Sequence, residues 1–155
     1  MSIEPIITRQ YRGKFNQAAS KFRDFAIPPE GWIRTARKAL GISAAQLGRR
    51  IGKTRALVSN TEKAELDGAV TLRTMRSMAE AANCRFIYAF VPEESAEVLI
   101  RRRAREKAER RVMEAGIHMA LEQQTLSKSQ IESEIERLTE EILREQPGDL
   151  WNDED

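Results

Sequence analysis

Residues 44–63 read AAQLGRRIGKTRALVSNTEK, and this stretch decides the expected fold. Two helices that cross closely need a small residue at the crossing, and Gly48 stands inside the first of them. A tight turn between the helices needs a glycine, and Gly52 follows four residues later. The chain supplies four apolar residues for the crossing: Leu47, Ile51, Leu57 and Val58. The pattern therefore predicts two short helices, of which the second projects from the domain.

Capping residues frame this pair with two further helices, so that four short helices are expected over residues 31–83. Ser43 and Gln46 form a Ser-x-x-Gln capping box at the start of the second helix. Thr54 and Thr71 have the hydroxyl side chain that N-caps prefer, and we expect them to begin the third and fourth helices. A helix pair in such a frame can place its second helix in the major groove of DNA.

Charge is distributed unevenly along the chain, although the net charge of the whole is only +2. Residues 31–64 hold eight basic residues against a single glutamate, a net charge of +7. Residues 127–155 hold three basic and ten acidic residues, a net charge of −7. A concentrated basic block indicates a polyanionic partner such as nucleic acid. The acidic end is expected to face solvent or to meet another protein.

The geometry of the helix pair suggests roles for individual side chains. Residues early on the third helix and on its outer face would reach base edges, where Arg55 can pair with guanine and Asn60 with adenine. The members of this base-reading set are Thr54, Arg55, Ala56, Ser59, Asn60 and Lys63. Basic residues around the motif would contact phosphates, which fix the register without reading sequence. The members of this phosphate set are Arg34, Arg49, Arg50 and Lys53. A solvated basic surface is the alternative for each of them.

The same residues resemble the Xre/Cro family of regulators, through RTARKAL (34–40), LGRRIG (47–52) and VSNTEK (58–63). This resemblance implies a lambda-repressor-like helix-turn-helix domain. GWIRTARKALGIS, EKAELDGAVTLRTM, CRFIYAFVP, HMALEQQ and DLW further resemble a bacterial group called mobile mystery protein A. That second resemblance implies a regulator encoded beside a Fic-domain partner. It suggests a toxin–antitoxin operon in which this chain is the antitoxin.

Residues 85–91, RFIYAFV, are β-branched and aromatic and precede Pro92, so we expect a short β-strand. A lone apolar strand leaves its backbone N–H and C=O groups unpaired, which is costly. We expect the same strand of a second copy to pair with it across a two-fold axis. Pairing with residues 3–8 of the same chain is the alternative. The residues expected in the dimer interface are Phe86, Ile87, Tyr88, Ala89, Phe90 and Val91.

The remaining segments are expected to be helical. Residues 10–26 have the apolar spacing of an amphipathic helix. Residues 93–124 predict a long helix with a break near Gly116, and a last helix begins at Ser127 or Ser129. The basic run at residues 101–111 is either a second DNA-binding arm or a solvated helix face.

We therefore expect an all-α fold with one short dimerising strand, in three parts. Residues 1–30 form an N-terminal amphipathic helix and linker, 31–92 a helix-turn-helix DNA-binding domain with the strand, and 93–155 a helical C-terminal extension. The expected function is sequence-specific transcriptional repression by a homodimer on an inverted-repeat operator, regulating its own toxin–antitoxin-like operon. The alternative is an antitoxin that binds and neutralises a Fic-domain toxin through residues 93–155.

Several other classes of protein are not expected. The sequence lacks a paired acid and base around a nucleophile, a phosphate-binding loop and metal-ligand spacing, so we expect no catalysis, cofactor or metal. No apolar run is long enough to span a membrane, and the first residues lack a secretion signal. The single cysteine, Cys84, fits a reducing compartment. We therefore expect a cytoplasmic protein of the bacterial nucleoid.

Overall fold

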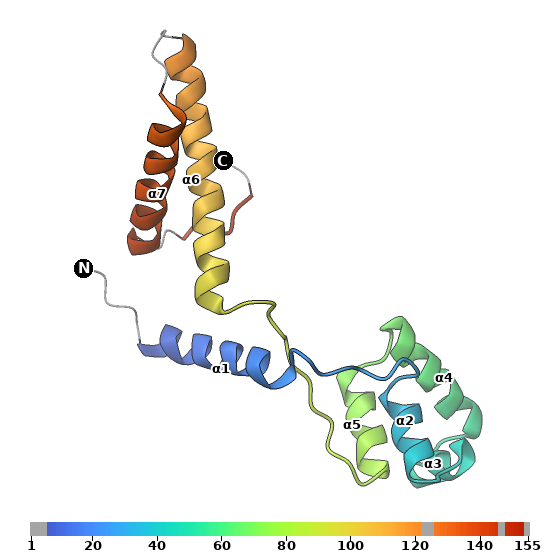
Figure 1. Cartoon of the computed structure of the whole chain (residues 1–155). Coiled ribbons are helices and arrows are strands. Elements are labelled where there is room, and N and C mark those ends of the chain that lie inside the picture. The colour runs from blue at the N-terminus through green and yellow to red at the C-terminus, as the bar shows by residue number, and fades with distance from the viewer. Residues whose placement is uncertain (1–5, 122–125, 146–147, 154–155) are drawn as a thin grey trace. The chain divides into compact units, whose positions relative to one another are not determined.

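The computed structural model describes residues 6–121, 126–145 and 148–153, which divide into two compact units (Figure 1). The central unit comprises residues 24–89, and the terminal unit combines residues 1–23 with residues 90–155. Each unit has its own hydrophobic core. The described residues form helices, turns and irregular segments, and none of them lies in a β-strand. The expected helical architecture is confirmed for this part of the chain.

The central unit contains four helices around one small core. They are α2 (Trp32–Ala39), α3 (Ala44–Arg50), α4 (Arg55–Asp67) and α5 (Leu72–Ala81). Each helix buries at least one apolar side chain. The core residues are Ile33, Leu47, Val58, Met75 and Met78. Leu47 and Val58 are almost completely excluded from solvent, as expected for residues at the crossing of α3 and α4.

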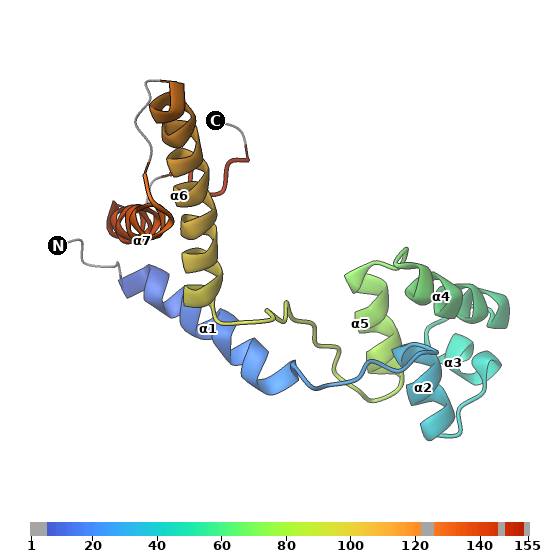
Figure 2. The same ribbon diagram turned by 45° about the horizontal axis from the view of Figure 1, so that its top comes forward.

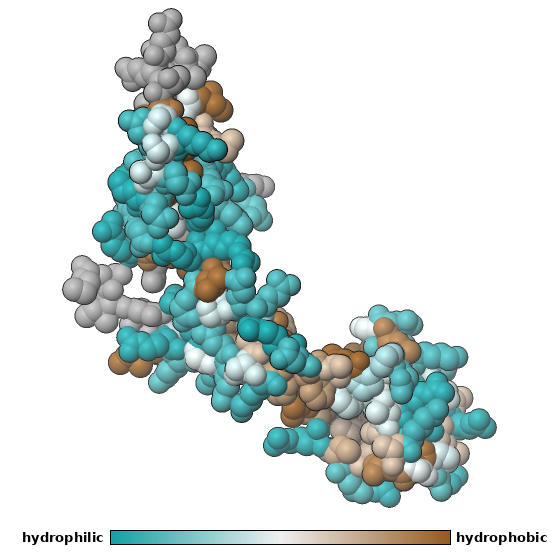
Figure 3. Space-filling model, viewed as in Figure 1, coloured by the Kyte–Doolittle hydropathy of each residue, from teal (hydrophilic) through white to brown (hydrophobic). Residues whose placement is uncertain are grey.

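The terminal unit is built on a hairpin of two helices. It contains α1 (Ile6–Phe22), α6 (Ala96–Leu121) and α7 (Lys128–Glu145). Helix α7 packs against α6 (Figure 1), and Figure 2 shows α7 end-on beside α6. Ala104 and Ala108 on α6 have no solvent exposure, so small side chains let α7 approach closely. Ile135 and Ile142 fill the seam from α7. Figure 3 shows the visible side of this hairpin covered mainly by hydrophilic residues.

A short C-terminal tail, residues 148–153, completes the core of the terminal unit. It passes from the α7 side of α6 to the opposite side (Figure 1), and Leu150 is buried in the same apolar cluster. Arg103 Nε donates to the carbonyl of Leu150 at 2.7 Å, and Arg103 Nη2 to that of Asn152 at 2.6 Å. Lys107 Nζ donates to the carbonyl of Asp149 at 2.7 Å. Both cations are buried, so the tail supplies the acceptors that they need.

The predicted strand at residues 85–91 is not seen in the single chain. This stretch is irregular, and no backbone hydrogen bond joins it to any described residue. A strand needs a partner, and the proposed internal partner does not supply one because residues 6–8 belong to α1. Residues 3–5 of that partner lie outside the described residues. Phe86 instead packs on the central core and stacks on Tyr88, with ring centroids 6.0 Å apart.

Helix boundaries follow the capping residues closely but not everywhere. The N-cap at Ser127 is confirmed, because its hydroxyl accepts from the backbone N–H of Gln130 at 3.2 Å. The predicted break near Gly116 is wrong, since α6 continues through that residue, and the expected end at Gln124 lies outside the described residues. Helix α4 ends at Asp67, and its C-cap, Gly68, adopts a left-handed conformation.

Candidate nucleic-acid interface

The turn between α3 and α4 is tight because two glycines permit it. A Cβ atom on Gly48 would lie 2.7 Å from the carbonyl oxygen of Lys53 and 3.1 Å from the backbone of Thr54. The same approach gives a backbone hydrogen bond of 2.7 Å from Lys53 N–H to Gly48 O. Gly52 has a φ of 68°, which side chains disfavour. Gly48 therefore stands where the backbone of the turn approaches α3, as the sequence predicts.

Side-chain caps fix where the helices of this motif begin. Ser43 N–H donates to Gln46 Oε1 at 2.8 Å, and Gln46 N–H donates to Ser43 Oγ at 3.0 Å, which completes the predicted capping box. Leu57 N–H donates to Thr54 Oγ1 at 3.1 Å. Because Thr54 is the N-cap of α4, its hydroxyl already has a partner, and Arg55 is the first helical residue.

The base-reading set lies on the outer surface of α4. Val58 is fully buried on the inner side of the helix, and this burial fixes which residues face outward. Ser59 is half-buried. The remaining members of the set are exposed: Thr54, Arg55, Ala56, Asn60 and Lys63. None of the six is packed inside the central unit, so the position of α4 leaves its first turns accessible to a ligand.

An open groove of about 660 Å³ adjoins this surface. Helix α2 contributes Arg34 and Arg37 to its lining, and α4 contributes Arg55, Ser59 and Lys63. The groove also reaches Ser43 at the start of α3, together with Glu30, Ala44, Ala45, Glu62 and Leu66. Arg34, an exposed member of the phosphate set, thus shares one concave surface with three residues from the base-reading set.

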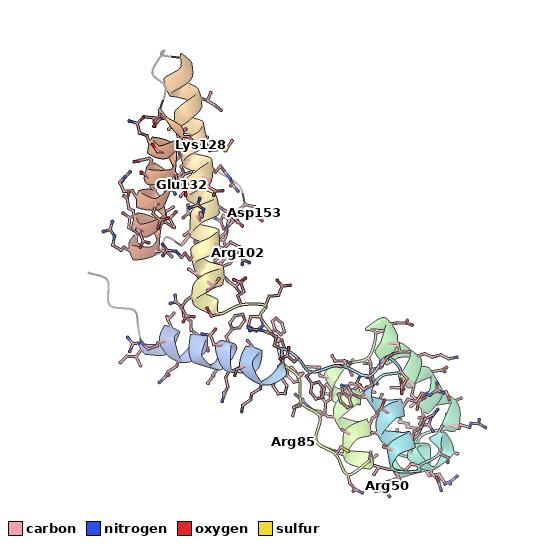
Figure 4. The ribbon with its side chains drawn as sticks, in the orientation of Figure 1. Arg50, Arg85, Arg102, Lys128, Glu132 and Asp153 are labelled. Atoms are coloured by element: carbon pink, nitrogen blue, oxygen red, sulfur yellow. The ribbon has the colours of Figure 1, made fainter. Side chains whose placement is uncertain are left out.

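The phosphate set is exposed, but one member also has a structural partner. Arg34, Arg49 and Lys53 are exposed. Arg50, labelled in Figure 4, donates from Nε to the carbonyl oxygen of Ala81 at 2.6 Å. This bond ties the end of α3 to the end of α5, where a cation also complements the helix dipole. Arg50 therefore contributes to the packing of the motif whatever else it contacts.

One ion pair inside the basic block was not predicted. Arg37 Nε lies 2.7 Å from Glu62 Oε1, and both side chains are largely buried. Arg37 Nη1 also donates to the carbonyl of Ile42 at 3.3 Å. This pair removes one cation and the only acid from the count over residues 31–64, so the remaining seven cations account for the net charge of +7. The isolation of Glu62 among eight basic residues is the sequence signal that it needs a partner.

The basic run on α6 is engaged within the terminal unit. Arg101 pairs with Glu136 at 2.9 Å and with Glu140, and Arg105 pairs with Glu132 at 2.8 Å. Hydrogen bonding to Glu140 raises the pKa of Arg101, and hydrogen bonding to Glu132 raises the pKa of Arg105. Figure 4 labels Glu132 on the α7 side of α6.

The part of the chain that the structure describes contains no group of three or more potential metal ligands. None of its helices combines the length and the apolar character that crossing a bilayer requires.

Comparisons with known proteins agree with the geometry of the central unit. No curated protein and no solved structure matched the chain. Residues 33–88 match a family model described as helix-turn-helix, and this range contains α2 to α5. Residues 33–88 therefore form an Xre-type helix-turn-helix domain, which supports a role for the chain in DNA binding and regulation.

Proposed function

We propose that the chain is a sequence-specific transcriptional repressor that reads DNA with α4. The observation that supports this most directly is the accessible first half of α4 beside a basic groove. In this proposal Arg55 and Asn60 read base edges, with Thr54, Ala56, Ser59 and Lys63 beside them in the major groove. Arg34, Arg49, Arg50 and Lys53 contact phosphates and set the register.

Selection of duplexes from a random pool, followed by a gel-shift titration, tests this proposal. The parent protein should select a defined sequence, and the logarithm of its affinity should fall linearly with the logarithm of salt concentration. Arg55→Ala should relax the preference at one base pair and cost about 1–3 kcal/mol there. Lys53→Ala should weaken all duplexes equally and reduce the salt slope by about one.

Lys128→Ala is the matched control, because it removes an exposed cation from the terminal unit instead. It should leave the selected sequence unchanged. If the parent protein selects no sequence at low salt, the repressor proposal is wrong.

We further propose that the repressor is a homodimer on an inverted-repeat operator. The proposed contact is made by residues 86–91, which would pair with the same residues of a second copy. Four large apolar side chains are exposed there: Ile87, Tyr88, Phe90 and Val91. The backbone groups of this stretch have no backbone partner among the described residues, which favours such pairing. Two recognition helices would then reach half-sites about 34 Å apart, or a multiple of that distance.

Sedimentation equilibrium tests the dimer. Ile87→Lys and Tyr88→Lys should each shift the protein towards monomer, because a charge would be buried in the contact. Ile117→Lys is the matched control, since Ile117 is an apolar residue of similar exposure on α6. Equal association of all three variants and the parent would exclude this contact.

The toxin–antitoxin context is a separate proposal that rests on the resemblance alone. In it, the operator lies in the chain's own promoter, and residues 93–155 bind a Fic-domain toxin encoded nearby. Co-purification of the full chain with the product of the adjacent gene tests the toxin contact. Failure to co-purify, with DNA binding intact, would remove the neutralisation role and leave the repressor role standing.

A further inference from the structure

Helix α2 is capped by a residue from another helix. The carboxylate of Glu65, near the end of α4, accepts the backbone N–H of Trp32 through Oε2 at 2.6 Å. It also accepts the backbone N–H of Ile33 through Oε1 at 3.0 Å. The N-cap position itself is Gly31, which has no side chain to perform this role. Glu65 therefore satisfies two of the N–H groups that a helix leaves unpaired at its start.

Gly31 makes room for this carboxylate. A Cβ atom at Gly31 would lie 2.9 Å from Glu65 Cδ and from both carboxylate oxygens. Gly31 also has a φ of 85°, a conformation that residues with a side chain rarely adopt. A glycine with positive φ and a half-buried glutamate, which are distant in sequence, thus together cap the start of α2.

The cap that Glu65 provides joins α2 and α4, the two helices that line the basic groove. One turn earlier on α4, Glu62 binds Arg37 of α2, so two carboxylates hold α2 against α4. Arg34 directly follows Ile33 in the capped turn of α2. Across the groove lie Arg55 and Lys63 of α4. The position of Arg34 relative to these two residues therefore depends on where the Glu65 carboxylate holds the first turn of α2.

We infer that Glu65 is a positioning residue for DNA binding, which places Arg34 for a phosphate contact beside α4. This inference rests on the proposed DNA-reading role of α4. The sign of its effect is distinctive. A carboxylate near a DNA-binding surface ordinarily lowers affinity through repulsion of phosphates, so its neutralisation should strengthen binding. A positioning role predicts that its neutralisation weakens binding.

Fluorescence anisotropy with a selected duplex of roughly 30 base pairs tests the inference, because that length spans two half-sites one turn apart. The variants are Glu65→Gln, Glu65→Ala and Gly31→Ala, each in the full chain. Asp67→Asn is the matched control, since it removes the same charge from the end of the same helix. The readouts are affinity and the slope of its logarithm against the logarithm of salt concentration.

Glu65→Ala should weaken binding about fivefold near physiological salt and reduce the salt slope by about one, the signature of one lost phosphate contact. Glu65→Gln, which keeps one amide oxygen as an acceptor, should lose less. Gly31→Ala should resemble Glu65→Ala because its Cβ displaces the carboxylate. In an Arg34→Ala background, Glu65→Ala should change neither slope nor affinity further. Asp67→Asn should bind as the parent or slightly more tightly.

A purely structural role for Glu65 would lower thermal stability without changing the salt slope measured well below the unfolding transition. Binding by Glu65→Gln and Glu65→Ala that equals or exceeds that of the parent, with the same slope, would overturn the inference. If the parent itself binds no duplex, the proposed DNA-reading role fails first, and this outcome is distinct from the loss of the inference alone.

Discussion

At the scale of single residues, two glycines, Gly48 and Gly31, allow close contacts within the central unit. Gly48 was predicted from sequence because helix crossing imposes a steric rule that is local and general. Gly31 and Glu65 were not, because their association requires the three-dimensional packing of α2 on α4. The partner of Glu62 was likewise hidden, since any of several arginines could have served. Steric rules can therefore be inferred from spacing, while the choice of charge partners cannot.

Gly48→Ala should destabilise the central unit by about 1–3 kcal/mol, because the added methyl group meets the turn backbone rather than a flexible side chain. Urea unfolding followed by circular dichroism, which reports on both units, measures this. Gly13→Ala, where a Cβ would enter open space in α1, is the control. It should raise the stability of its own unit by about 0.5–1 kcal/mol. Equal effects of the two variants would refute the steric account.

Removal of Arg37 alone should cost more than removal of both partners of its ion pair. Arg37→Met leaves the largely buried Glu62 carboxylate without its cation, at a cost of about 2–4 kcal/mol. The double variant Arg37→Met/Glu62→Met replaces both charges with apolar side chains and should recover much of that loss. Urea unfolding gives the free energy of unfolding of the two variants and the parent. A double variant that loses as much stability as Arg37→Met, or more, would contradict this prediction.

At the scale of elements, capping residues predicted helix starts better than apolar patterns predicted strands. Ser43, Thr54, Thr71 and Ser127 all begin helices as expected, because each cap is a contact with a residue three positions away. The apolar stretch at residues 85–91 failed as a strand, because strand formation requires a distant partner that local sequence does not reveal. Gly116 failed as a break since one glycine only weakens a helix.

The start of α6 should make the terminal unit sensitive to acid. Asn16 Oδ1 accepts the N–H of Ala96 at 2.7 Å, and Asn16 Nδ2 donates to Glu97 at 3.0 Å. A backbone hydrogen bond, aided by Asn16, lowers the pKa of Glu97 below its usual 4.5. The folded state then binds fewer protons than the unfolded state, so this stabilisation exists above that value and is lost as pH falls through the lowered pKa.

Thermal unfolding of the terminal unit between about pH 5 and pH 3 tests this, and Glu97→Gln should flatten the pH dependence. Glu114→Gln, which removes a carboxylate from the same helix, should leave the pH dependence of thermal unfolding unchanged. Equal slopes for both variants would exclude Glu97 as a source of the acid sensitivity.

At the scale of the whole molecule, the chain consists of two folding units, one of which is discontinuous in sequence. Residues 24–89 have their own core and capped helices, so this fragment should fold alone. Expressed by itself it should unfold cooperatively, as followed by circular dichroism. It should also bind a single half-site with a smaller salt slope than the full chain, because it lacks part of residues 86–91. A fragment without cooperative unfolding would show that the central unit needs the rest of the chain.

The C-terminal tail should be essential to the terminal unit. Leu150→Ala should lower the free energy of unfolding by about 2–4 kcal/mol, because Leu150 fills the core between α6 and α7. Trp151→Ala is the control, since this side chain is largely exposed and its ring lies beside the guanidinium group of Arg103. Its loss should be below about 1 kcal/mol. Circular dichroism at increasing urea measures both variants, and equal losses would mean that Leu150 is not the anchor.

The hydrogen bonds from α6 to residues 149–152 affect which substitutions this protein can tolerate. Arg103 and Lys107 reach mainly carbonyl oxygens of the polypeptide backbone, which every amino acid provides in the same place. Substitutions at Asp149 or Asn152 therefore leave those backbone acceptors intact. At Leu150 the side chain itself matters, because it fills space in the apolar core. Related chains should therefore conserve the cations at positions 103 and 107 and an aliphatic side chain at position 150. The residues at positions 149 and 152 should vary.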